Sequence, residues 1–178
     1  MIIETKRLIL RPWREDDAET LFKYASDDRV GPVTGWHPHK SVEESREVLK
    51  NILMKEGTFA ITVKERGDEP IGSFGIFESD ESPTEGELEL GYWLGVPFWG
   101  NGYVPEAVRA AIKGIFETTD WQRVWCGHFE GNDKSRRVVE KCGFEFYRKH
   151  EVYWGPLEKN VVNNAYFITR EKFYKTEK

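Results

Sequence analysis

Residues 91–107 decide the fold expected for this chain, and they read Gly-Tyr-Trp-Leu-Gly-Val-Pro-Phe-Trp-Gly-Asn-Gly-Tyr-Val-Pro-Glu-Ala. An apolar, aromatic stretch with strand character gives way to a loop with a glycine pair, Gly100 and Gly102. Pro105 and Glu106 then open a run with helical spacing. The first turn of a helix leaves N–H groups unpaired at the positive end of its dipole, and glycines let a ligand approach the backbone. The segment therefore predicts an anion-binding helix N-terminus, although a glycine pair alone is also typical of an ordinary turn.

The composition limits the class of protein. The chain has 178 residues, of which 39% are hydrophobic and 32% charged, as in soluble globular proteins, and residues 1–178 are expected to form one domain. A net charge of −5 argues against nucleic-acid binding. Because there are only two cysteines, no signal-peptide pattern and no long apolar span, the sequence predicts no membrane attachment and a reducing, cytoplasmic location.

The periodicity of apolar residues predicts about seven strands and about four helices. The expected strands cover residues 6–12, 59–63, 71–77, 87–94, 123–126, 144–154 and 161–169. The helices are expected after Asp16-Asp17, from a capping box at Ser41, over 105–118 and over 132–142. This order predicts a mixed α/β fold with a mostly antiparallel central sheet, and a loop over residues 27–40.

Four motifs in this chain occur in the same order as in the GNAT acetyltransferases, and together they span most of its length. They are Thr5-Lys-Arg-Leu-Ile-Leu-Arg11, Glu89-Leu-Gly-Tyr-Trp-Leu94, Trp99-Gly-Asn-Gly-Tyr103 and Asn132-x-x-Ser-x-Arg-Val-x-Glu-Lys-x-Gly-Phe144. They resemble the Rim-type branch, named for acetylation of ribosomal-protein N-termini. The family loop Gln/Arg-x-x-Gly-x-Gly/Ala is matched strictly only at Gly102, with Trp99 and Val104 at its ends. The resemblance implies the GNAT fold, with a sheet splayed between its fourth and fifth strands.

The resemblance further implies that acetyl-CoA binds in the splayed gap, with its pyrophosphate on the loop amides that follow Trp99. The end of the fourth strand would pair with the pantetheine arm, and Asn132 would contact that arm while also suiting a helix N-cap. Either Arg136 or Arg137 could bind the ribose phosphate, although surface arginines are often only decoration. The cofactor-binding residues expected on this basis are Trp93, Leu94, Trp99, Gly100, Asn101, Gly102, Tyr103, Val104, Asn132 and Ser135.

The implied chemistry is attack of a neutral amine on a thioester, which requires a proton acceptor and an oxyanion donor. Glu89 is the expected base, because burying a glutamate within a strand is costly, and Glu87 is the substitute two residues earlier on the same face. A main-chain N–H of Trp93 or Leu94 is the expected oxyanion donor.

A third group would protonate the departing thiolate. Many family members use a tyrosine for this step, but that position is Val139 here. Ser135, four residues earlier on the same helix face, is the expected replacement, and it also suits a polar position near a helix start. Trp36 and His37 are expected to line the acceptor side, where His37 is a second candidate base or simply a loop histidine.

The sequence thus predicts an N-acetyltransferase acting on a protein N-terminal α-amine, for example of a ribosomal protein, or on a small-molecule amine. A non-catalytic acyl-CoA-binding module and an acyltransferase using a different acyl-CoA stay open as alternatives. The pairs His37-Pro-His39 and Cys126-Gly-His128 lack the four-ligand spacing of a zinc site, so no metal is predicted. Exposed aromatic residues such as Trp154 would suit a homodimer contact.

Overall fold

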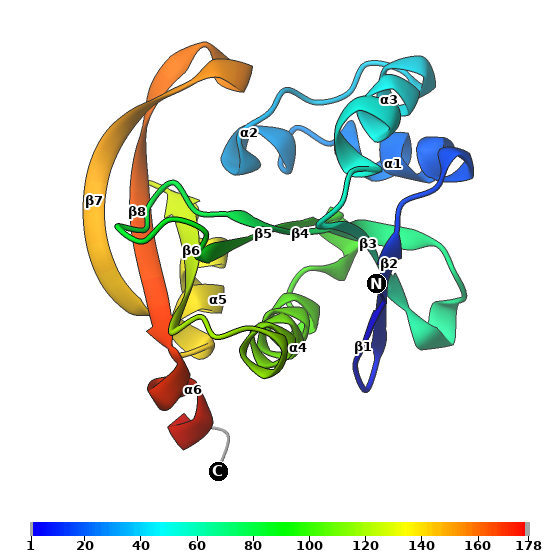
Figure 1. The fold of residues 1–178 in the computed structure, drawn as a ribbon. Coiled ribbons are helices and arrows are strands. Elements are labelled where there is room, and N and C mark those ends of the chain that lie inside the picture. Colours follow the sequence, from blue (N-terminus) through cyan, green and yellow to red (C-terminus); the bar gives the residue numbers. More distant parts are fainter. Residues whose placement is uncertain (1, 177–178) are drawn as a thin grey trace.

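A computed structural model describes residues 2–176, and its central feature is an eight-stranded sheet (Figure 1). The strand order is β1-β2-β3-β4-β5-β6-β8-β7, and only the β5–β6 pair is parallel. The strands are β1 (Ile3–Glu4), β2 (Leu8–Pro12), β3 (Thr58–Val63), β4 (Pro70–Glu78), β5 (Leu88–Leu94), β6 (Arg123–Phe129), β7 (Glu145–Trp154) and β8 (Lys159–Thr169).

Helices cover both faces of the sheet, as Figure 1 shows. One face carries α1 (Ala18–Ala25), α2 (Gly31–Thr34) and α3 (Val42–Val48), which a π-helical segment, Leu49–Leu53, continues. The other face carries α4 (Tyr103–Thr118) and α5 (Asp133–Lys141), and α6 (Arg170–Thr176) follows β8. The predicted mixed, mostly antiparallel fold is confirmed. Beyond the predicted elements, the described chain adds β1, α6 and the short α2 inside the expected loop over residues 27–40.

The apolar stripe of α4 packs on the sheet as its spacing predicts. Its buried residues are Val104, Ala107, Val108, Ala111, Ile112, Ile115 and Phe116. They join one core cluster with Leu90 of β5 and Val124 of β6. A second, smaller cluster on the other face holds Trp13, Leu21 and Leu49 under α1 and α3. The two cores clamp the sheet between them, so the strand ends have fixed positions.

The parallel pair β5–β6 separates partway along its length. Pairing is limited to three positions, at Leu88–Val124, Glu89–Trp125 and Leu90–Cys126. Beyond Leu90, β5 stays hydrogen-bonded to β4, while β6 stays hydrogen-bonded to β8. Each strand therefore follows its antiparallel neighbour, and a gap opens between residues 91–94 and residues 127–129. The predicted splay between the fourth and fifth expected strands is confirmed here.

A buried ion pair fastens the first helical layer to the sheet. Arg11 on β2 is 4% exposed and Asp17, in the turn before α1, is 6% exposed. The Arg11 guanidinium donates to both carboxylate oxygens of Asp17 at 2.8 Å and to Asp68 Oδ1 at 2.7 Å. Removing one partner of such a pair leaves an uncompensated buried charge, which costs far more than losing an exposed ion pair.

We expect Asp17→Asn to lower the free energy of unfolding by about 3 kcal/mol. Asp68, whose side chain is 55% exposed, provides the matched control, and Asp68→Asn should cost less than about 1 kcal/mol. Urea unfolding monitored by tryptophan fluorescence measures both variants. Equal losses would show that burial of the Arg11 charge is not the deciding factor.

Candidate active site

A cleft of about 930 Å³ opens where β5 and β6 separate. It is bounded by β5, the loop and first turn of α4, one side of α5, and α2 with the residues just before it. Nine of the ten predicted cofactor-binding residues line it, and the tenth, Asn101, lies in the same loop without lining the cleft. Asn101 Nδ2 instead donates to the Phe98 carbonyl at 3.0 Å, which holds the loop in shape. The residues predicted from sequence therefore form one continuous set around the cleft. Their role in cofactor binding stays a prediction.

The helix N-terminus at this cleft begins with a left-handed glycine. Gly102, the N-cap residue of α4, has φ +76°, a value that favours glycine. Because glycine has no side chain to cap the helix, the N–H groups of the first turn keep their capacity to bind an anion. Tyr103 and Val104, the first two residues of that turn, line the cleft. The arrangement is that of an anion site at the positive end of a 16-residue helix.

The N-terminal segment braces this loop from behind. Glu106 Oε1 accepts from Thr5 Oγ1 at 2.6 Å and from the Arg7 N–H at 2.9 Å, and Oε2 accepts from Arg7 Nε at 2.6 Å. The Arg7 guanidinium also donates to the Asn101 carbonyl at 3.0 Å and lies 4.7 Å from the Tyr103 ring centroid. The first sequence motif therefore acts on the glycine loop through contacts between residues about 100 positions apart, which spacing alone could not reveal.

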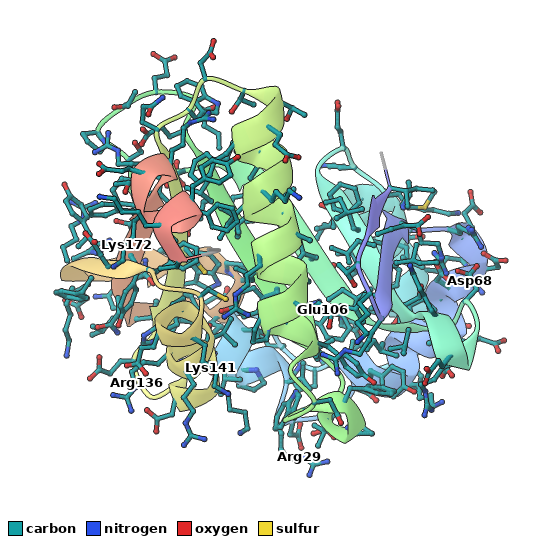
Figure 2. All side chains as sticks on the ribbon, turned by 90° about the horizontal axis from the view of Figure 1, so that it is seen from below. Arg29, Asp68, Glu106, Arg136, Lys141 and Lys172 are labelled. Carbon is teal, nitrogen blue, oxygen red and sulfur yellow. The ribbon has the colours of Figure 1, made fainter. Side chains whose placement is uncertain are left out.

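Positive charge collects around the cleft of an otherwise acidic chain. Its lining contains four cationic side chains, Arg29, Lys134, Arg137 and Lys141, and one carboxylate, that of Asp133. Figure 2 shows Arg29 and Lys141 toward the end of the molecule where α4 begins. Of the two neighbouring arginines that the sequence singled out, only Arg137 lines the cleft, whereas Arg136 forms an ion pair with Asp133 at 3.3 Å. The cleft therefore suits a ligand with several negative charges.

Two residues of β5 direct main-chain groups into the gap. The Ser79 N–H donates to the Glu87 carbonyl, and the Gly95 N–H donates to the Ile71 carbonyl, at the two ends of the β4–β5 ladder. Because hydrogen-bonded positions alternate in an antiparallel pair, Trp93 faces β4, and Tyr92 and Leu94 face the side that β6 has left. The Leu94 carbonyl accepts from Trp99 Nε1 at 2.8 Å. Of the two predicted oxyanion donors, the Leu94 N–H is the one directed into the gap.

Two hydroxyl groups meet in the cleft. Tyr92 Oη and Ser135 Oγ lie 2.9 Å apart, and both residues line the cleft. Burial raises the pKa of the Tyr92 phenol well above its ordinary value, so the phenol keeps its proton. Val139 is fully buried in the core and offers no polar group. Sequence reasoning missed Tyr92, although it stands within the motif of Glu89 and, three residues later, on the opposite face of the strand.

Glu89 lies half-buried on the face that carries α1 to α3. Its Oε2 accepts from Ser79 Oγ at 2.9 Å. Burial, with smaller contributions from the Glu81 and Asp80 carboxylates, raises the pKa of Glu89 to about 7, against the lowering effect of the Ser79 hydrogen bond. A carboxylate with this pKa exchanges protons near neutral pH. Glu89 therefore stays the candidate for the predicted base.

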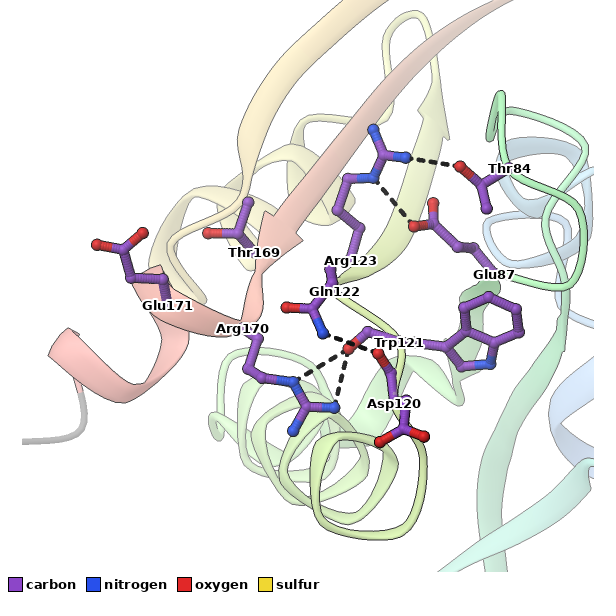
Figure 3. Close-up of a pocket in the computed structure, with 9 residues that line it drawn as sticks. All are labelled: Thr84, Glu87, Asp120, Trp121, Gln122, Arg123, Thr169, Arg170 and Glu171. Carbon is purple, nitrogen blue, oxygen red and sulfur yellow. Dashed lines mark hydrogen bonds and ion pairs between the residues drawn. The ribbon is translucent and has the colours of Figure 1, made fainter.

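Glu87, the predicted substitute, is fully engaged in structure. It is 3% exposed and accepts from Ser82 Oγ at 2.5 Å, from Arg123 Nε at 3.1 Å and from Trp125 Nε1 at 2.7 Å. It borders a second, open hollow of about 560 Å³, shown in Figure 3, where the Arg170 guanidinium donates to the Trp121 carbonyl near the end of α4. The partners of Glu87 hold its carboxylate in place, so Glu89 is the better base candidate.

The predicted acceptor-side residues separate in the structure. Trp36 packs edge-on against Trp93 with ring centroids 5.6 Å apart, whereas His37 is exposed. His39 takes the place next to Trp36, at 5.3 Å between centroids, and its Nδ1 lies 2.8 Å from Ser45 Oγ. Burial lowers the pKa of His39, which favours the neutral ring. Trp36 thus lies against the face of β5 that carries Trp93. The predicted place of His37 on the acceptor side stays a prediction.

Asn132 connects the cleft to the segment that carries Trp36. Its Oδ1 accepts from the Ser135 N–H at 3.1 Å and caps α5, as the sequence predicted. Its Nδ2 donates to the Val33 carbonyl of α2 at 3.0 Å. One side chain therefore joins two walls of the cleft.

Among residues 2–176, no three His, Cys, Asp or Glu side chains are grouped so as to hold a metal ion. Within the same part of the chain, no helix is long and apolar enough to cross a membrane. Cys126 and Cys142 are both buried thiols.

Comparisons with known proteins agree with this geometry. Residues 7–145 match a family model described as an acetyltransferase (GNAT) domain. An uncharacterized N-acetyltransferase, p20, of Bacillus licheniformis is 33% identical over 146 residues, which cover 79% of this chain and 80% of the relative. The ribosomal protein uS5-alanine N-acetyltransferase of Escherichia coli (strain K12) is 24% identical over 163 residues, covering 80% and 77%. A crystal structure of a GNAT-family acetyltransferase from Bacillus anthracis shares the fold, with a TM-score of 0.82 at 22% identity, and the match covers 96% of this chain and 99% of that chain.

Asn132→Asp tests the connection between α5 and α2, because it keeps the oxygen that caps α5 but loses the donor to Val33. The N–H groups of Gly35 and Trp36, which close α2, should then exchange with deuterium about fivefold to tenfold faster, since one neutral hydrogen bond contributes about 1 kcal/mol. Hydrogen exchange followed by NMR measures this. Asn132→Ala is the comparison variant and should in addition lower the free energy of unfolding by about 1 kcal/mol through loss of the cap. Unchanged exchange in both variants would contradict the connection.

Proposed function

The chain belongs to the GNAT acetyltransferase family, and from this membership we propose that it transfers an acetyl group from acetyl-CoA to a primary amine. The observation that carries the proposal is the cleft between β5 and β6, which has a helix N-terminus at one end and unpaired strand main chain along its side. The family membership supports N-acetyl transfer in general.

The cleft fits coenzyme A in size and charge. Its volume of about 930 Å³ lies in the range of cofactor pockets. The first-turn amides of α4 would hold the pyrophosphate, and Arg137 and Lys141 would take a further phosphate group. The N–H and carbonyl of Tyr92 and the N–H of Leu94 would pair with the amides of the pantetheine arm and with the thioester oxygen. When bound, acetyl-CoA supplies the activated acetyl group.

Glu89 is the proposed base for the acceptor amine. Its side chain lies on the face opposite to Tyr92, because alternate residues of a strand point to opposite faces. The cleft is lined by α2 on one face of the sheet and by α5 on the other. An amine that approaches on the face of α1 to α3 would therefore reach the thioester from the side of Glu89. Glu89 would take the ammonium proton directly or through a water molecule.

Ser135 and Tyr92 are the proposed donors to the departing sulfur. As the new C–N bond forms and the C–S bond breaks, negative charge moves to the thiolate. Ser135 Oγ stands on the cleft side and is hydrogen-bonded to the phenol of Tyr92. The two hydroxyls can supply a proton or a hydrogen bond to the sulfur from the face opposite to Glu89.

We propose a protein N-terminal α-amine or a small amine as acceptor, and the uS5-alanine N-acetyltransferase relative supports the first class. The deciding experiment measures thiol release from acetyl-CoA with a panel of amines and N-terminal peptides. Release with at least one acceptor is the expected result. Binding of acetyl-CoA without release would identify a non-catalytic module instead. Faster release from propionyl- or succinyl-CoA would identify a different acyl donor.

Glu89→Gln should lower kcat/KM by about 100-fold or more, because a positioned base contributes about 10²–10⁴. The base acts only when ionised, and its pKa is about 7, so the wild-type advantage over the variant should grow with pH up to about 7 and then level off. Both proteins are measured with the same acceptor, so the ionisation of the amine affects both rates equally and drops out of their ratio. Asp80→Asn should move the wild-type limb to lower pH, because the Asp80 carboxylate raises the pKa of Glu89. If kcat/KM of Glu89→Gln depended on pH in the same way as that of the wild type, Glu89 would not be the base.

Arg137→Gln should raise KM for acetyl-CoA about tenfold, since a hydrogen bond to a charged group contributes about 1.5 kcal/mol. The neighbouring Arg136→Gln is the matched control, and it should change KM less than about twofold because Arg136 pairs with Asp133 and lies outside the cleft lining. Steady-state kinetics at low and high salt measure both. Equal effects would mean that general charge, and not a cleft contact, sets the affinity.

A further inference from the structure

The sheet face on the side of Glu89 carries an unusual row of residues. Three directly opposed pairs of β4 and β5 stand on this face, namely Ser73–Trp93, Gly75–Gly91 and Phe77–Glu89. Trp93 packs against the smaller core beneath α1 and α3, which identifies the face. The middle pair consists of two glycines, so the sheet has no side chain of its own between Trp93 and Glu89.

The ring of Phe77 fills that space. A Cβ placed on Gly91 would stand 3.0 and 3.1 Å from atoms of the Phe77 ring, and one on Gly75 would stand 3.2 and 3.3 Å from it. Those distances are shorter than most side-chain contacts, so a side chain at either position would push the ring away by a few tenths of an ångström, and the two glycines let the ring lie along the sheet. Phe77 is nevertheless 50% exposed, and the outer surface of the ring is open.

An open aromatic surface beside a half-buried carboxylate has the character of a ligand-binding floor. Ligand sites combine apolar and aromatic walls with a few placed polar groups. Phe77 is the direct cross-strand partner of Glu89, and directly opposed Cβ atoms lie about 5 Å apart. Trp93 and Trp36 continue the aromatic surface beyond the glycine pair. A group attached near an amine at Glu89 would therefore rest on the Phe77 ring.

We propose that Phe77 is the floor of the acceptor subsite and that it selects primary amines carrying an aromatic or bulky apolar group about two carbons from the nitrogen. This inference rests on the proposed acetyl transfer and adds the class of acceptor. Two sources share this chemistry, a free arylalkylamine and a peptide that begins with an aromatic residue. Stacking on the ring adds to burial of the apolar group and so favours such acceptors over short alkyl amines.

The test compares kcat/KM for phenethylamine with kcat/KM for n-propylamine, and a Phe-Gly-Gly peptide with a Gly-Gly-Gly peptide. The wild type should prefer the aromatic member of at least one pair about tenfold, and the pair concerned identifies the source. Phe77→Ala should reduce that preference about tenfold, because the ring contact and the apolar surface that it buries are both lost. Phe77→Tyr keeps the ring and should restore the preference.

Phe146→Ala provides the matched control, because Phe146 is also exposed, at 57%, but stands on β7 and packs against Tyr166. It should keep the wild-type preference. Equal selectivity in the wild type and Phe77→Ala would overturn the Phe77 subsite while leaving acetyl transfer intact. Absence of thiol release with every amine, in the wild type and in Phe146→Ala alike, would overturn the proposed function and the subsite together.

Discussion

The separation of β5 from β6 is the constraint on which the rest of this structure depends. Each strand is held by a longer antiparallel partner, β4 on one side and β8 on the other, and these partners lead in different directions. A parallel pair of three positions cannot hold the strands together against them. The groups of Tyr92 and the Leu94 N–H that face the gap are thereby left without a strand partner in the middle of a sheet, a cost that a bound ligand with amide groups can offset. The helix start and the cations of α5 then surround a gap that the sheet itself creates.

Much of this arrangement could be predicted from sequence, because it depends on local signals and on their order. The glycine pair before a helical run, the capping asparagine and the apolar stripe of α4 are each readable from neighbouring residues, and the order of four motifs indicated the fold. The sequence did not reveal the brace formed by Arg7 and Glu106, the hydrogen bond from Asn132 to Val33, or the meeting of Tyr92 with Ser135. These contacts join residues 99, 99 and 43 positions apart, where periodicity carries no information.

Glu87, just before β5, and Glu89, within it, show how little residue type and spacing determine. Glu87 and Glu89 lie on one face, two residues apart, and the same chemistry was predicted for either. Glu87 meets a guanidinium, an indole N–H and a hydroxyl, all of which stabilise its charge in place. Glu89 meets one hydroxyl and two nearby carboxylates, which leave its proton exchangeable near neutral pH. Tertiary neighbours, and not the strand, distinguish the carboxylate that is held in structure from the one that is the candidate base.

The side chains of Tyr92 and Glu89 lie on opposite faces of β5. The register of this strand therefore determines which side of the site carries the carboxylate and which carries the hydroxyls. A shift of one position would exchange the two faces and place the acidic group among the hydroxyls. Single-residue insertions or deletions within β5 should therefore be rare among functional descendants of this chain. Changes in length should instead collect at the exposed residues 83–85, at the tip of the connection between β4 and β5. Natural variation in length along this hairpin would thus show where β5, whose register positions the reacting groups, ends and where the tolerant tip of the connection begins.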